Sequence, residues 1–136
     1  MKYSDENPPI VCLALDSYCY KHEERRLSPP LGVLWHDTGV GNKNLKRYVS
    51  PASTDPKRSE LIALIGDSGG SQTYNKYTNQ NEAENRGMPH AVIGMLPNGQ
   101  IATVQILPWN YRSWGCGGKA NDGWIQFEIC RDYSDH

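Results

Sequence analysis

The sequence lacks an excess of charge of either sign. Its 136 residues include 14 Lys and Arg and 15 Asp and Glu, which give a formal net charge of -1. Without a basic surplus, the composition predicts no non-specific binding to nucleic acid or to anionic lipid. The polar N-terminus has no signal-peptide pattern, and no apolar run approaches the ~20 residues of a membrane span. We therefore expect a chain made in the cytoplasm, which needs release to act outside the cell.

Cysteine is sparse and follows no pairing pattern. The absence of a C-x-x-C pair argues against a zinc knuckle or a thioredoxin-like motif, and free buried thiols are the expectation for a cytosolic chain. Internal repeats and low-complexity tracts are also absent, and the length fits one domain. We expect a lead-in over residues 1–30 and a main unit over 31–136. The four cysteines are Cys12, Cys19, Cys116 and Cys130.

Apolar patterning and turn residues predict the order strand, helical segments, hairpin, strand. This order favours the α/β class, with a mixed central β-sheet and flanking helices. Both faces of the first strand are apolar, which predicts cover on both sides. The predicted strands are 31–36, 90–96, 100–107 and 124–130, the predicted helices are 42–49 (with Asn42 as N-cap) and 57–65, and a long loop is predicted over 66–89.

The sequence stops six residues after the last predicted strand. A mixed sheet with an apolar reverse face needs a covering helix, and none follows in this sequence. We therefore expect a domain that lacks its C-terminal helix and strand, and that aggregates or dimerises as an isolated piece.

His36 is the first candidate site residue, because it ends an apolar strand and Asp37-Thr38-Gly39 turns the chain directly after it. A strand end that faces a loop is a common place for a site, although a buried histidine with one hydrogen bond is an equal alternative. Glu128 is the second candidate. It lies in an apolar strand, on the face that also carries Gln126 and Cys130, and a half-buried carboxylate there suits a general base.

Other residues carry weaker signals. His90 opens the predicted hairpin and taken alone is a strand-edge histidine, and Asn121 taken alone is a turn residue. The loop aromatics Trp109, Tyr111 and Trp114 either pack or form a groove wall. A less favoured alternative pairs the Cys116 thiol with His90 as nucleophile and base. Cys116 lies between glycines and not at a helix N-terminus, where a thiolate is stabilised.

Five segments together resemble the zinc-dependent N-acetylmuramoyl-L-alanine amidases, a family that includes phage and prophage endolysins and peptidoglycan recognition proteins. The resemblance runs from about residue 30 to residue 131. Its most specific parts are the apolar strand that ends in His36 and the Asn-x-x-x-Ile-x-Phe-Glu pattern from Asn121 to Glu128. The segments are Leu31–Gly39, His90–Gly94, Pro97–Ile101, Trp114–Gly117 and Asn121–Cys130.

The resemblance implies a cell-wall hydrolase that cleaves the amide between N-acetylmuramic acid and L-alanine. His36 matches the family's first Zn²⁺ ligand, and Glu128 matches the carboxylate that activates the zinc-bound water. His90, Trp109, Trp114 and Asn121 fall on positions near the metal or beside the groove for the peptidoglycan substrate. The other two zinc ligands are expected beyond residue 136. A zinc-free muropeptide-binding module and an inactive prophage fragment are the alternatives.

Overall fold

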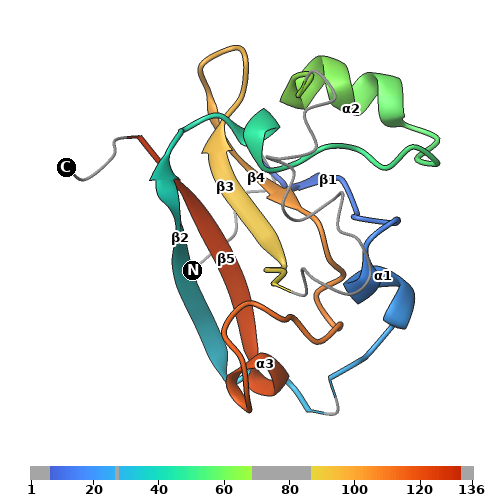
Figure 1. The fold of residues 1–136 in the computed structure, drawn as a ribbon, viewed down its shortest axis with the longest axis vertical. Helices are drawn as coiled ribbons and strands as arrows, with labels where there is room; N and C mark the ends of the chain where they lie inside the picture. The colour runs from blue at the N-terminus through green and yellow to red at the C-terminus, as the bar shows by residue number, and fades with distance from the viewer. Residues whose placement is uncertain (1–6, 27, 69–86, 133–136) are drawn as a thin grey trace.

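The computed structural model describes residues 7–26, 28–68 and 87–132, which form one five-stranded mixed sheet with short helices (Figure 1). The sheet order is β1-β4-β3-β5-β2, where β3 and β4 pair antiparallel and the other neighbours pair parallel. The predicted α/β class with a mixed sheet is confirmed. The strands are β1 (Ile10–Val11), β2 (Gly32–Gly41), β3 (Ala91–Met95), β4 (Ile101–Gln105) and β5 (Trp124–Arg131).

The helical segments are short, and they agree only in part with the sequence patterns. The predicted helix over 57–65 is confirmed, whereas the one over 42–49 shrinks to a single 3-10 turn. Its cap is Asn44 and not Asn42, because Asn42 Oδ1 accepts a hydrogen bond from Asn44 N (3.0 Å) and closes a turn before the helix begins. The segments are α1 (Tyr18–His22), η1 (Leu45–Arg47), α2 (Arg58–Ile65) and α3 (Ala120–Gly123).

The predicted hairpin is confirmed. β3 and β4 pair from Ala91 with Gln105 to Met95 with Ile101. Gly99 has a φ of +86° in the connecting turn, a conformation that glycine adopts without steric cost. Most of the predicted loop, residues 69–86, lies outside the described residues.

The hydrophobic core lies on one face of the sheet. Val92 of β3 and Val104 of β4 are register partners and are fully buried, and we call their side of the sheet the core face. Ile10 and Glu128 are register partners of these valines, and His36 pairs with Glu128, so all three lie on the core face. The covering side chains are Cys19 of α1, Leu45 of η1, and Leu61 and Ile65 of α2.

The described part of the first thirty residues packs on the sheet. β1 pairs parallel with β4, and Cys12, Ala14 and Cys19 are buried in the same core as β3 and β4. Residues 10–22 therefore belong to the same folded unit as the sheet.

The opposite side of the sheet, which we call the reverse face, carries exposed apolar side chains. The prediction that the first strand is covered on both sides is wrong for the part of the chain that the structure describes. β2 is an edge strand, and apolar residues on both of its faces indicate only that the reverse face is apolar, not that it is covered. The exposed fractions are 55% for Val11, 42% for Val33, 60% for Trp35, 64% for Ile101 and 41% for Ile129.

Among the described residues, no helix is long and apolar enough to cross a bilayer.

Candidate functional site

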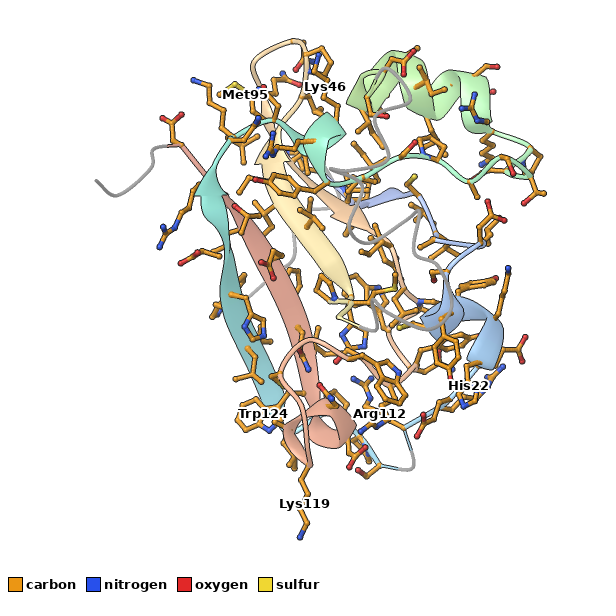
Figure 2. The ribbon with its side chains drawn as sticks, viewed as in Figure 1. His22, Lys46, Met95, Arg112, Lys119 and Trp124 are labelled. Atoms are coloured by element: carbon orange, nitrogen blue, oxygen red, sulfur yellow. The ribbon has the colours of Figure 1, made fainter. Side chains whose placement is uncertain are left out.

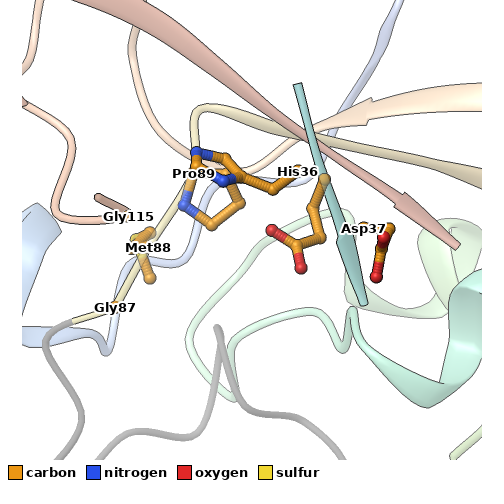
Figure 3. Close-up of a pocket in the computed structure, with 7 residues that line it drawn as sticks. His36, Asp37, Gly87, Met88, Pro89 and Gly115 are labelled. Carbon is orange, nitrogen blue, oxygen red and sulfur yellow. The ribbon is translucent and has the colours of Figure 1, made fainter. Parts of the chain in front are cut away.

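A pocket opens on the core face, at the side of the sheet formed by β5 and β2. It has a volume of about 230 Å³, just below the ~300 Å³ at which small-molecule sites usually begin. Figure 3 shows His36 and Asp37 of β2 on one side and the segment Gly87–Pro89 on the other. Glu128 of β5 and Gly115 complete the lining.

The sheet register brings the two principal candidates together. β2 and β5 run parallel, and His36 pairs directly with Glu128 although 92 positions separate them in the sequence. Neighbouring strands lie about 4.8 Å apart, so an imidazole and a carboxylate stand side by side at the pocket. Both side chains are half-buried. Such a pair can bind and move protons while it remains in contact with a ligand.

His36 has a buried partner that the sequence analysis did not single out. His36 Nε2 lies 3.2 Å from Gln126 Oε1, and the Gln126 side chain is fully buried. The signal was present in the two-residue period of the strand, which places Gln126 on the same face as Glu128. A polar side chain that is buried there requires hydrogen-bond partners, and His36 is one of them.

Asn121 lies behind the pocket and does not line it. Its side chain is 3% exposed. Its Oδ1 accepts hydrogen bonds from the backbone N of Cys116 (3.1 Å) and from Gln126 Nε2 (3.2 Å). The structure therefore connects Asn121 to His36 through Gln126, and does not place it against a ligand.

His90 is fully buried, and both of its ring nitrogens are used. Nε2 lies 2.8 Å from the carbonyl oxygen of Tyr111, and Nδ1 accepts from the backbone N of Gln126 at 3.0 Å. Burial is the main cause that lowers the pKa of His90 to about 4, so the ring is neutral near pH 7. His90 holds the backbone of β5 and lies away from the pocket surface.

The alternative pair of Cys116 and His90 does not form in the structure. The Cys116 thiol instead lies 3.1 Å from Gln126 Nε2 and 3.3 Å from Asn121 Oδ1. Burial raises the pKa of this thiol, which opposes the thiolate form that a nucleophile needs. All four cysteines are free, as expected, but only Cys12 and Cys19 are fully buried.

The loop aromatics pack on the protein and do not form one groove wall. Trp109 packs against Phe127 with tilted rings, at a centroid distance of 5.8 Å, and Phe127 in turn contacts Trp35 of the reverse face. Trp114 packs under the Arg112 guanidinium, and its backbone N donates to the carbonyl oxygen of Met88 at 3.0 Å. Trp114 therefore supports the pocket segment from behind, while Trp109 contributes to the aromatic cluster of the reverse face.

Arg112 is a further residue that the sequence analysis did not identify. Figure 2 labels Arg112 beside α3. The Arg112 Nε lies 2.5 Å from Asp122 Oδ1 and 3.6 Å from Glu24 Oε1. Asp122 belongs to α3, a helix of four residues that has no side-chain N-cap. The ion pair thus connects α3, and with it the neighbouring Asn121, to the N-terminal part of the chain.

The described residues do not by themselves fit a complete zinc centre. Catalytic zinc usually takes three protein ligands and keeps one open position. Within the described ranges, no group of three or more His, Cys, Asp or Glu side chains is placed to hold a metal ion. Asp37 also lines the pocket, but its carboxylate accepts from Gly39 N (2.8 Å) and pairs with Arg131 (2.9 Å). The hydrogen bond from Gly39 N is the largest cause that lowers the pKa of the Asp37 carboxyl, and Arg131 lowers it further.

Comparisons with protein-family models, with curated proteins and with solved structures gave no match for this chain. The resemblance to the peptidoglycan amidases therefore stays a prediction from the sequence. The structure shows a mixed α/β sheet that brings His36 and Glu128 together at a pocket.

Proposed function

We propose that this domain hydrolyses peptidoglycan at the amide bond between N-acetylmuramic acid and L-alanine. One observation carries the proposal: His36 and Glu128 pair in register at a pocket on the core face. An imidazole that can bind a metal ion, next to a carboxylate that can accept a proton, suits the attack of water on an amide. The aromatic and glycine-rich segment that resembles the amidases, Trp114–Gly117, lies between these two residues in the sequence.

Glu128 is the better placed of the two pocket carboxylates to move a proton. Asp37 is held by Arg131 and by the backbone of Gly39. Glu128 is the direct register partner of His36. In the proposed reaction, Glu128 takes a proton from the attacking water and passes it to the nitrogen of the leaving amine. The C–N bond of the amide breaks as the new C–O bond forms.

We further propose His36 as the first ligand of the Zn²⁺ ion that the resemblance implies. The described residues supply no complete ligand set with it. No step of the reaction is therefore assigned to the metal.

The same observation favours a second candidate, a muropeptide-binding module that does not cut. A pocket with one imidazole and no three-ligand cluster in the described ranges can still hold a sugar-peptide through hydrogen bonds. This candidate predicts binding to cell walls that does not depend on His36.

Both candidates are tested on intact peptidoglycan with the full chain purified without chelator. The assay measures bound zinc, binding to sacculi, and free amino groups released at L-alanine. For the hydrolase we expect zinc and release in the unchanged chain, and loss of both in His36→Ala. His22→Ala is the matched control, because His22 is exposed on α1. Binding to sacculi without release of amino groups would reject the hydrolase and support the binding module.

A further inference from the structure

Behind the pocket lies a chain of hydrogen bonds. The donor and the acceptor of each bond can be assigned in turn, starting from one group that can only donate. The backbone N–H of Cys116 can only donate, and it lies 3.1 Å from the side chain of Asn121. The Asn121 atom in this contact is therefore the oxygen, Oδ1. The same oxygen lies 3.2 Å from the Gln126 amide, so the facing Gln126 atom is the NH₂ group.

The orientation of Gln126 then determines the proton on His36. With its NH₂ turned to Asn121, Gln126 presents Oε1 to His36 Nε2 at 3.2 Å. An amide oxygen only accepts, so Nε2 must carry a hydrogen. An amide side chain is ordinarily ambiguous in orientation, but here a backbone donor at the start of the chain removes the ambiguity.

We propose that Gln126 and Asn121 are positioning residues that hold His36 with its hydrogen on Nε2. The lone pair of the neutral ring is then on Nδ1, and a metal ion or a proton donor in the pocket meets that nitrogen. The use of this lone pair in catalysis rests on the proposed function, whereas the position of the hydrogen does not.

Burial and packing keep the chain of contacts in place. Gln126 is fully buried and Asn121 is 3% exposed, so water does not compete for their amides. The backbone of Gln126 is also held, because its N donates to His90 Nδ1 at 3.0 Å and its carbonyl oxygen accepts from His90 N at 2.8 Å. A Cβ on Gly115 would lie 2.2 Å from Gln126 Oε1, so glycine at 115 permits the contact with His36.

The Cys116 thiol is not needed for this arrangement. Gln126 Nε2 also lies 3.1 Å from Cys116 Sγ, but the direction of the chain is set by the backbone of Cys116. Replacement of the thiol therefore leaves the fixed donor in place and provides a matched control.

The test is an NMR measurement on the full chain, labelled with ¹⁵N at histidine, free of metal and at a pH well above the ordinary His pKa of ~6.5. We expect a His36 ring proton on Nε2 whose exchange with water is slowed, and a non-protonated Nδ1. His36→Gln assigns the signal by its loss. A His36 proton on Nδ1, or a ring proton that exchanges as fast as that of the exposed His22, would overturn the proposal.

Variants separate positioning from simple stability. Gln126→Met and Asn121→Leu should lose the slowly exchanging His36 proton, while Asn121→Asp, which keeps the oxygen acceptor, and Cys116→Ala should retain it. The His90 ring proton is an internal reference, because its partner, the carbonyl oxygen of Tyr111, is backbone and remains in every variant. Retention of the protected His36 proton in Gln126→Met, beside an intact His90 signal, contradicts the proposal.

One variant leaves every donor and acceptor in place. Gly115→Ala should displace Gln126 Oε1 and release the His36 proton to fast exchange, and unchanged protection there also contradicts the proposal. Should protection follow the prediction while no amino groups are released from peptidoglycan, the proposed function fails and this inference stands.

Discussion

The two faces of the sheet differ most where β5 and β2 lie side by side. On the core face, His36, Gln126 and Glu128 line the pocket or support it, and Gln126 is hydrogen-bonded to His36 and to the buried Asn121. On the reverse face, Val33, Trp35 and Ile129 of the same strands are apolar, and Trp35 remains 60% exposed. Side chains alternate between the two faces of a strand. Neighbouring residues of β2 and β5 therefore form a candidate reaction site on one face and a surface that favours association on the other.

The largest difference between the two faces is expected in the rate of amide hydrolysis, when Glu128 and its neighbour in β5, Ile129, are substituted in turn. Glu128→Gln should lower amide hydrolysis by ~10²–10⁴-fold, the usual contribution of a general base. Ile129→Ser, one position further on the reverse face, should leave the rate unchanged. The release of amino groups from peptidoglycan measures both. Equal rates for the unchanged chain and Glu128→Gln would remove Glu128 from the reaction.

Acid should weaken the core face through His90. The folded pKa of about 4 lies below the ordinary pKa of ~6.5, so the unfolded chain binds the proton more tightly. The contribution of neutral His90 to the free energy of unfolding is therefore present above pH ~6.5. It is lost as pH falls toward 4, and the loss amounts to about 3 kcal/mol in total. Urea unfolding across this range measures the loss, and His90→Gln should flatten it. A stability that stays constant from pH 7 to pH 4 would contradict the burial of a neutral His90.

Removal of the Gln126 amide should cost less but still be measurable. Gln126→Leu removes one hydrogen bond of the buried Asn121 Oδ1 and leaves the Nε2 hydrogen of His36 without its partner, which we expect to lower the free energy of unfolding by ~1–3 kcal/mol. Urea denaturation at neutral pH measures the change. Trp35→Ser on the reverse face is the comparison, and it should change stability less because Trp35 is mostly exposed. The opposite order would show that the buried network contributes little.

The smallest effect is expected in self-association. The exposed apolar side chains of the reverse face should drive the 136-residue chain to dimers or larger species at micromolar concentration. Trp35→Ser should weaken this association about tenfold or more, because a large apolar side chain no longer leaves water. Leu64→Ser on α2 is a matched control, since Leu64 is 44% exposed away from this face. Sedimentation over a concentration series gives the answer, and a monomer at all concentrations would refute the expectation.

Local sequence patterns predicted the strands and helices better than they predicted what covers them. The strand that carries Glu128, the hairpin around Gly99 and the helix before Gly66 follow from period and turn residues, and each is confirmed. The open reverse face was not predicted, because apolar residues on both sides of 31–36 do not reveal what covers them. The packing of residues 10–22 on the core depends on the pairing of β1 with β4, a contact between distant segments that a local pattern does not encode.

The residues of the candidate site could likewise be predicted better than their contacts. His36 and Glu128 could be selected from their places on apolar strands, and the register then shows them to be neighbours. Gln126 was noted on the correct face, but its bond to His36 depends on a contact between two strands 90 positions apart. His90 was predicted near the substrate, and the structure buries its ring against the carbonyl oxygen of Tyr111. A histidine at a strand start looks the same in the sequence whether it faces a ligand or a backbone carbonyl.

We propose that the core face at β2 and β5 is a hydrolytic site that depends on His36. The most direct measurement is the release of free L-alanine amino groups from purified peptidoglycan by the full chain and by His36→Ala. We predict release by the unchanged chain and none above background by His36→Ala, with the His22→Ala control equal to the unchanged chain. Release that persists in His36→Ala, or no release by the unchanged chain in the presence of added zinc, would contradict the claim.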